Sequence, residues 1–195
     1  MRHDGRHDSS SGQVRIIGGT LRNSRLRVPD QAGLRPTPER VRETVFNWLA
    51  PVIAGARCLD MCAGTGALGI EALSRGAASV VFVERDREVA RALGDSLARL
   101  KAANGTVVTS LAQDYLRGVG QAFDVVFLDP PFALDLCVAL AQQLRDGGWL
   151  APSALIYVES ARTAAALPSA TWRVHRQADA GAVRYALYRS LPGAT

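Results

Sequence analysis

The alternation of strand-like and helix-like segments from residue 56 onward constrains the fold of this chain more than any other feature. One apolar run typical of a strand ends at Asp60, and similar runs follow at 79–84, 105–109, 123–128 and within 148–158. Helical patterns lie between them, at 66–75, 86–101 and 133–145. This order predicts an α/β fold, with a parallel sheet covered by helices on both faces. Two further strands, near 171–177 and 182–189, are joined by a turn too short for a crossover helix and should be antiparallel.

The segment before residue 56 has a different pattern. Residues 13–28 interleave apolar side chains with arginines around Gly18-Gly19, which predicts a β-hairpin. A helix is predicted over residues 38–49, with Pro38 in its first turn and Thr37 as its N-cap. The first twelve residues are polar and predict a disordered tail.

Composition excludes several classes of protein. The chain has 195 residues, of which 48% are hydrophobic, enough for one domain with a sizeable core. No apolar run approaches the roughly 20 residues of a bilayer span, and the start lacks the apolar segment of a signal peptide. The three cysteines, Cys58, Cys62 and Cys137, are interpreted as core residues in a reducing cytoplasm, with a zinc site as the alternative.

Positive charge is concentrated near the N-terminus. The net charge is +5, and between Arg15 and Arg42 seven arginines stand against Asp30 and Glu39. Such a segment suits a polyanion such as nucleic acid. A solvated surface that maintains solubility explains the charge equally well.

A glycine-rich loop follows the first predicted strand of the sheet. It runs from Asp60 to Gly69 and contains Gly64-x-Gly66-x-x-Gly69, which lets a ligand approach backbone amides at a helix N-terminus. Dinucleotides and S-adenosylmethionine both use this geometry. The carboxylate of Asp60 would oppose a pyrophosphate but suits a cationic ammonium group, which favours S-adenosylmethionine. A loop needed only for helix–strand packing is the remaining alternative.

Two further acidic residues complete the predicted cofactor site. Glu84 ends the second strand of the sheet, where it would accept hydrogen bonds from both ribose hydroxyls. Asp114 follows the third strand and is placed to accept from an adenine amino group. Either residue could instead be an ordinary strand end or turn former.

The sequence Asp129-Pro130-Pro131-Phe132 after the fourth strand is the most specific signal in the chain. The lone pair of an amine on a nucleobase is delocalised into the ring, so the amine attacks a methyl donor poorly. Two acceptors on its hydrogens, the Asp129 carboxylate and the Pro130 carbonyl, would make it more tetrahedral. Phe132 would stack the base. The alternative is a stiff turn with Phe132 in the core.

These motifs, in this order, resemble those of class I methyltransferases. The blocks Arg15-Ile16-Ile17-Gly18-Gly19, residues 34–43 (LRPTPERVRE) and residues 69–77 (GIEALSRGA) more narrowly resemble the 16S ribosomal RNA guanine-N2 methyltransferases of the RsmD type. The resemblance implies a Rossmann-like, seven-stranded, mostly parallel sheet with an antiparallel last strand and an N-terminal β-hairpin. It divides the chain into a tail (1–12), a hairpin and loop that contact RNA (13–37) and a methyltransferase domain (38–195).

The resemblance also implies which residues act. Asp129, Pro130 and Phe132 would hold the target base. S-adenosylmethionine would be bound by Asp60, Ala63, Gly64, Thr65, Gly66, Glu84 and Asp114. RNA phosphates would be contacted by Arg15, Arg22, Arg25, Arg27, Arg35 and Arg40. No metal is expected, and the expected partner is 16S ribosomal RNA in a complete or assembling small subunit, bound by a monomeric cytoplasmic protein.

Three other functions stay open at this point. The same turn would accept adenine N6 in DNA or RNA, or a glutamine amide of a protein, since each presents a planar NH2 group. A non-catalytic RNA-binding assembly factor on a methyltransferase fold is an alternative of another class. A dinucleotide-dependent oxidoreductase is the third. The N-terminal blocks argue against the other methyl acceptors. The intact glycine loop, Glu84 and the Asp129-Pro130-Pro131-Phe132 turn argue against a non-catalytic protein, and Asp60 argues against a dinucleotide.

Overall fold

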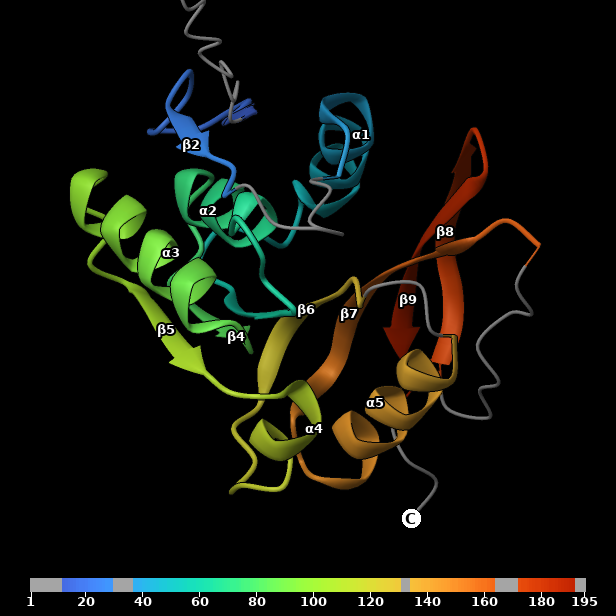
Figure 1. Ribbon diagram of the computed structural model, residues 1–195. Helices are drawn as coiled ribbons and strands as arrows, with labels where there is room; N and C mark the ends of the chain where they lie inside the picture. Colours follow the sequence, from blue (N-terminus) through green and yellow to red (C-terminus); the bar gives the residue numbers. More distant parts are fainter. Residues whose placement is uncertain (1–11, 30–36, 131–133, 164–171, 192–195) are drawn as a thin grey trace, which may run out of the picture.

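A computed structural model describes residues 12–29, 37–130, 134–163 and 172–191 of the chain (Figure 1). Three predicted features therefore lie outside the described residues: the N-terminal tail up to residue 11, Arg35 in the following loop, and Phe132. None of the helices within the described ranges is long and apolar enough to cross a membrane.

A seven-stranded sheet forms the centre of the molecule, in the order β5-β4-β3-β6-β7-β9-β8. The strands from β3 to β7 are parallel, and β9 runs antiparallel to both of its neighbours, β7 and β8. The predicted fold class is therefore confirmed. The strands are β3 (Arg57–Met61), β4 (Ser79–Glu84), β5 (Gly105–Thr109), β6 (Phe123–Leu128), β7 (Leu150–Ala161), β8 (Trp172–Ala180) and β9 (Val183–Ser190).

Helices cover both faces of this sheet, as Figure 1 shows. On one face lie α1 (Glu39–Leu49), α2 (Ala67–Ser74) and α3 (Arg87–Arg99), whose apolar side chains share a core with the sheet. On the other lie α4 (Ala112–Tyr115) and α5 (Leu134–Asp146), with a second core. The short helix α4 was not predicted, because four residues carry too little periodicity to be recognised.

The predicted N-terminal hairpin is present, with β1 (Gln13–Arg15) antiparallel to β2 (Arg25–Arg27). Val14 and Leu26 pair across the two strands and both belong to the core shared with α1 to α3. Every residue of α2 is buried, since the sheet covers one side of this helix and the hairpin segment contacts the other. A helix that is apolar or pair-forming all round needs such two-sided cover.

The start of α1 differs from the prediction. Pro38 occupies the N-cap position and no side chain caps the helix, so the assignment of Thr37 as the N-cap is wrong. The Thr37 hydroxyl instead lies 3.5 Å from the carboxylate of Asp129, which follows β6 and is 92 positions away in the chain. A tertiary partner has replaced the local one, and local sequence patterns contain no signal for that choice.

Candidate active site

The glycine loop between β3 and α2 is built around Asp60. This carboxylate is buried at the end of β3 and accepts a hydrogen bond from the Gly69 amide at 2.9 Å. Gly69 is required here because an added Cβ would lie 2.2 Å from the Phe82 ring. Burial raises the pKa of Asp60 well above its usual range, repulsion from Asp129 and Glu84 adds to the rise, and the Gly69 hydrogen bond opposes it.

The second acidic residue, Glu84, holds the other end of the loop. Its two carboxylate oxygens accept from the amides of Gly64 at 2.8 Å and Asp86 at 2.9 Å. The amide of Ala63 bonds the carbonyl of the residue before Glu84, which ties the loop to β4. Each Glu84 oxygen retains a second lone pair for a ligand hydroxyl. The structure thus brings together the predicted cofactor residues Asp60, Ala63, Gly64, Thr65, Gly66 and Glu84, of which all six are buried.

Asp129 follows β6, next to the glycine loop in the sheet, because β6 pairs with β3. It is partly buried, whereas Pro130 is buried. Burial raises the pKa of Asp129 to about 7; repulsion from Glu159 contributes, and the hydrogen bond from Thr37 opposes the rise. Asp129 therefore changes its charge near neutral pH.

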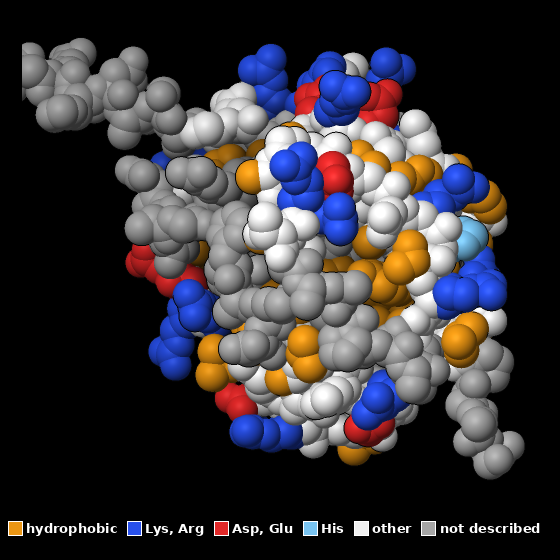
Figure 2. All heavy atoms as spheres, turned by 90° about the vertical axis from the view of Figure 1, so that its right-hand side faces the viewer, with side chains coloured by type: hydrophobic (Ala, Val, Ile, Leu, Met, Phe, Trp, Pro, Cys, Tyr) orange, Lys and Arg blue, Asp and Glu red, His pale blue; other side chains and the backbone are white. Residues whose placement is uncertain are grey.

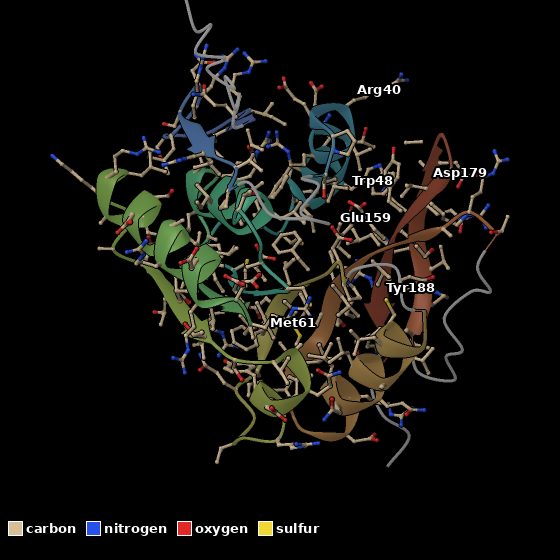
Figure 3. All side chains as sticks on the ribbon, viewed as in Figure 1. Arg40, Trp48, Met61, Glu159, Asp179 and Tyr188 are labelled. Carbon is tan, nitrogen blue, oxygen red and sulfur yellow. The ribbon has the colours of Figure 1, made fainter. Side chains whose placement is uncertain are left out.

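Glu159 is a further acidic residue next to Asp129, and it was not among the predicted site residues. It lies near the end of β7 and pairs across the sheet with Tyr185, whose ring stacks on Trp48 of α1; Figure 3 labels Glu159 and Trp48. The Tyr157 hydroxyl donates to it at 2.6 Å. In the sequence, Glu159 is recognisable only as a polar residue at the end of an apolar strand. That pattern is too common to identify a functional residue.

Together, four carboxylates converge at the carboxyl ends of β3, β4, β6 and β7: Asp60, Glu84, Asp129 and Glu159. No lysine or arginine within the described ranges forms an ion pair with any of them. Such a cluster favours a cationic ligand and repels a pyrophosphate. S-adenosylmethionine carries a sulfonium and an ammonium group and fits this site, whereas a dinucleotide fits it poorly.

Asp114 lies on α4, which follows the strand next to β4. Its side chain is exposed and pairs with Arg117 of the same helix, at 2.6 Å. The carbonyl of Glu84 accepts a hydrogen bond from the Ser110 amide, which brings the start of this segment against the cofactor loop. Asp114 is therefore at the edge of the carboxylate cluster rather than within it.

A second buried ionic cluster joins the hairpin to the sheet domain, and it was missed from sequence. Glu71 of α2 is fully buried and accepts from the amides of Ile17 and Gly18 at 2.7 and 2.8 Å. It also pairs with Arg75 at 2.7 Å and lies 3.7 Å from buried Arg42. Three sequence blocks that seemed separate thus meet at one carboxylate.

Arg42 extends this cluster toward the active site. Its guanidinium donates to the carbonyl of Arg15 at 2.9 Å and to the carbonyl of Thr37 at 3.2 Å. Because the hydroxyl of Thr37 contacts Asp129, hydrogen bonds run from the hairpin through Arg42 and Thr37 to the active site.

The arginines predicted to contact RNA are exposed wherever they are described. Arg15 is paired with Glu39, and Arg25 donates to Gln13 at 3.1 Å. Arg22, Arg27 and Arg40 extend from the hairpin and α1 without an ion pair to a described residue. These three are therefore the best placed of the predicted set to meet a polyanion.

Comparisons with known proteins agree with this geometry. Residues 14–189 match a family model described as Conserved hypothetical protein 95. The chain is 54% identical to Ribosomal RNA small subunit methyltransferase D of Escherichia coli strain K12, over 93% of this chain and 92% of that protein. An Escherichia coli structure named "Putative methyltransferase yhhF" has a TM-score of 0.86 and 51% identity, covering 93% of this chain and 100% of that one.

A more distant structure shares the fold alone. It is described as "a putative methyltransferase complexed with SAH", with a TM-score of 0.66 and 15% identity, and the match covers 85% of this chain and 53% of that chain.

Proposed function

This chain belongs to the RsmD family of ribosomal RNA small subunit methyltransferases, and we therefore propose that it methylates the exocyclic N2 amine of a guanine in 16S ribosomal RNA. The methyl donor is S-adenosylmethionine. The observation that carries the proposal is the cluster of four carboxylates without an ion pair to a described residue, in which Asp129 borders the glycine loop. A ribosomal RNA substrate supports a cytoplasmic location for the reaction, which is part of the same proposal.

The cofactor would be held by the carboxyl ends of β3 and β4. The carboxylates of Asp60 and Glu84, which hold the loop amides of Gly69 and Gly64, would also accept from its ammonium and hydroxyl groups, and the backbone between Ala63 and Gly66 would lie against it. When bound, S-adenosylmethionine supplies a methyl group on sulfur; the S–C bond breaks, with its electron pair left on sulfur, as the new N–C bond forms. Asp114 would contribute to cofactor binding at the edge of the site; in this structure its carboxylate pairs with Arg117.

Asp129 and Pro130 act on the target base. The carboxylate of Asp129 and the carbonyl of Pro130 accept from the two hydrogens of the amine, which directs its lone pair toward the methyl group. After transfer the amine carries a positive charge, and its extra proton leaves to Asp129 or to water. Phe132 is expected to stack the flipped-out base, a prediction that falls outside the described residues.

The hairpin and α1 would bind the RNA around that base. Arg15, Arg22, Arg25, Arg27 and Arg40 surround the segment that Glu71 and Arg42 fix to the domain. Arg35 completes the predicted set outside the described residues. The guanine-N2 specificity is supported by the resemblance of these N-terminal blocks, and a small-subunit particle and a monomeric enzyme remain part of the proposal.

One variant tests the proposal directly. Asp129→Ala should lower methyl transfer to 16S ribosomal RNA by at least about 100-fold, as expected for loss of a transition-state contact, while calorimetry still detects S-adenosylmethionine binding. Asp95→Ala, on the exposed side of α3, is the control. Near-normal turnover by Asp129→Ala would contradict the mechanism.

Nucleoside mass spectrometry of the modified RNA tests the acceptor. N2-methylguanosine is expected, and N6-methyladenosine would overturn the assignment of the base. Failure of the wild-type protein to bind S-adenosylmethionine would instead favour a non-catalytic assembly factor.

A further inference from the structure

The β8–β9 hairpin carries a second concentration of positive charge, far from the N-terminal arginines in sequence. Residues 172–190 contain four arginines and one acidic residue, Asp179. Arg184 is neutralised by that aspartate at 2.9 Å. The other three, Arg173, Arg176 and Arg189, have no ion pair within the described residues. Among the described residues, the hairpin therefore has three arginine charges without an acidic partner.

Strand register places these three arginines on one face of the sheet. Arg173 pairs directly with Arg189, and Arg176 pairs with Leu187 after an irregularity at His175. Since paired residues point to the same side and successive residues of a strand alternate, Leu187 and Arg189 share a face. His175 lies among the three arginines, whose repulsion adds to the effect of burial in lowering its pKa. The positive charge of this group is thus supplied by arginine.

Figure 2 looks onto this edge of the molecule and shows Lys and Arg side chains gathered around the histidine. Arg173, His175 and Arg176 are exposed, and Arg189 is partly buried. We call the four residues the β8–β9 arginine patch.

The same register connects this patch to the candidate active site. Leu187 pairs with Tyr157, and Tyr157 pairs with Phe127, two residues before Asp129. Arg176 is therefore in the same cross-strand row as Phe127 of β6, the strand that Asp129 follows, and on the same face of the sheet. Three strand spacings and two residues along the strand separate Arg176 from Asp129 by roughly 16 Å. A polyanion whose base enters the site would reach this patch if its chain ran along this face of the sheet.

We propose that the β8–β9 arginine patch is a second RNA-binding surface, which holds phosphates of the substrate on the side of the active site opposite the N-terminal hairpin. The inference rests on the proposed function, since it extends the RNA footprint of the same site. Arg173 and Arg176 on the edge strand β8 and Arg189 on the adjoining β9 have no ion pair with a described residue and repel one another, and phosphates would relieve that repulsion. Arginines on an edge strand also discourage its pairing with strands of other molecules. RNA binding would be a second role for these arginines.

The double variant Arg173→Gln/Arg176→Gln tests the surface. Its affinity for deproteinised 16S RNA should fall about tenfold, and the slope of log affinity against log salt should decrease by about 1.4, the value for two phosphate contacts on a single strand. The kcat at saturating RNA and the Kd for S-adenosylmethionine should stay within about twofold, because the patch touches neither reacting group. Arg184→Gln, on the same hairpin but already paired with Asp179, is the matched control.

The outcomes separate this inference from the proposed function. If wild-type protein methylates the RNA and the double variant keeps its affinity and salt slope, the patch is not an RNA site. An equal loss in Arg184→Gln would also overturn it. Loss on small-subunit particles but not on free RNA would assign the patch to a ribosomal protein instead. Absence of methyl transfer by the wild type, with RNA affinity still dependent on Arg173 and Arg176, would overturn only the proposed function.

Discussion

The hydroxyl oxygen Oγ1 of Thr37 lies 3.5 Å from the carboxylate oxygen Oδ2 of Asp129. The two residues are 92 positions apart, and Thr37 is fixed at the start of α1 by the Arg42 guanidinium, which binds its carbonyl. This contact connects the N-terminal part of the chain to the residue that we propose for catalysis. Its length indicates a weak hydrogen bond, which stabilises the charged form of Asp129.

The first prediction concerns this contact. Thr37→Val removes the donor while keeping the shape, so the pKa of Asp129 should rise and the acid limb of the pH profile should move to higher pH. At pH 6 we expect kcat/KM for S-adenosylmethionine to be about two- to fivefold below wild type, the size of one weak charge-assisted hydrogen bond. Thr37→Ser keeps the donor and should behave like wild type. A purely structural role would lower the rate equally at all pH values.

The second prediction concerns Glu159, whose negative charge raises the pKa of Asp129. With that pKa at about 7, the wild type should lose activity as the pH falls below about 7, by about tenfold per unit, because a protonated Asp129 accepts the amine hydrogens poorly. Glu159→Gln removes the repulsion and should move this limb to lower pH. The measurement is kcat/KM for S-adenosylmethionine between about pH 5.5 and about pH 8.5, a range that brackets about pH 7. A shift of the acid limb to higher pH in Glu159→Gln would contradict the role given to Asp129.

The third prediction concerns the buried cluster under the hairpin. Glu71→Gln leaves Arg42 buried without its counter-charge and should lower the free energy of unfolding by about 3–5 kcal/mol. Urea denaturation measures this change. Glu43→Gln, on the exposed side of α1, is the matched control and should change stability by less than about 0.5 kcal/mol. A loss of similar size in both variants would mean that the ionic cluster is not the cause.

The fourth prediction compares two glycines with positive φ. Gly19 has φ +75°, and an added Cβ would lie 1.8 Å from the Ser74 carbonyl oxygen; Gly181 has φ +61° with open space around it. Gly181→Ala should cost about 1–2 kcal/mol from backbone strain alone. Gly19→Ala should cost clearly more and should also weaken RNA binding, since the hairpin would have to move away from α2. Equal unfolding free energies for the two variants would rule out close docking of the hairpin.

Much of the architecture was predictable because individual strands and helices follow from patterns of residues that are close together in the sequence. The strands 79–84, 105–109 and 123–128 were predicted with the bounds that the structure shows, since short runs rich in β-branched and apolar residues between turn residues mark strands. The glycine loop and the Asp129-Pro130 turn were located because each contains unusual residues next to a strand end. Asp60 and Glu84 were expected to face the cofactor, and the structure places both beside the loop amides.

Local patterns of residues were enough to predict the order of strands and helices and the residue types at each strand end. Which distant groups became partners depends on how the folded chain packs. Thr37 hydrogen-bonds to Asp129 instead of capping its own helix, and Glu71 contacts residues from separate sequence blocks. Arg173, Arg176 and Arg189 share one face of the sheet. Local conformation depends on neighbours within a few residues, whereas burial removes water from a charge and forces it to find whichever partner the packed chain brings near.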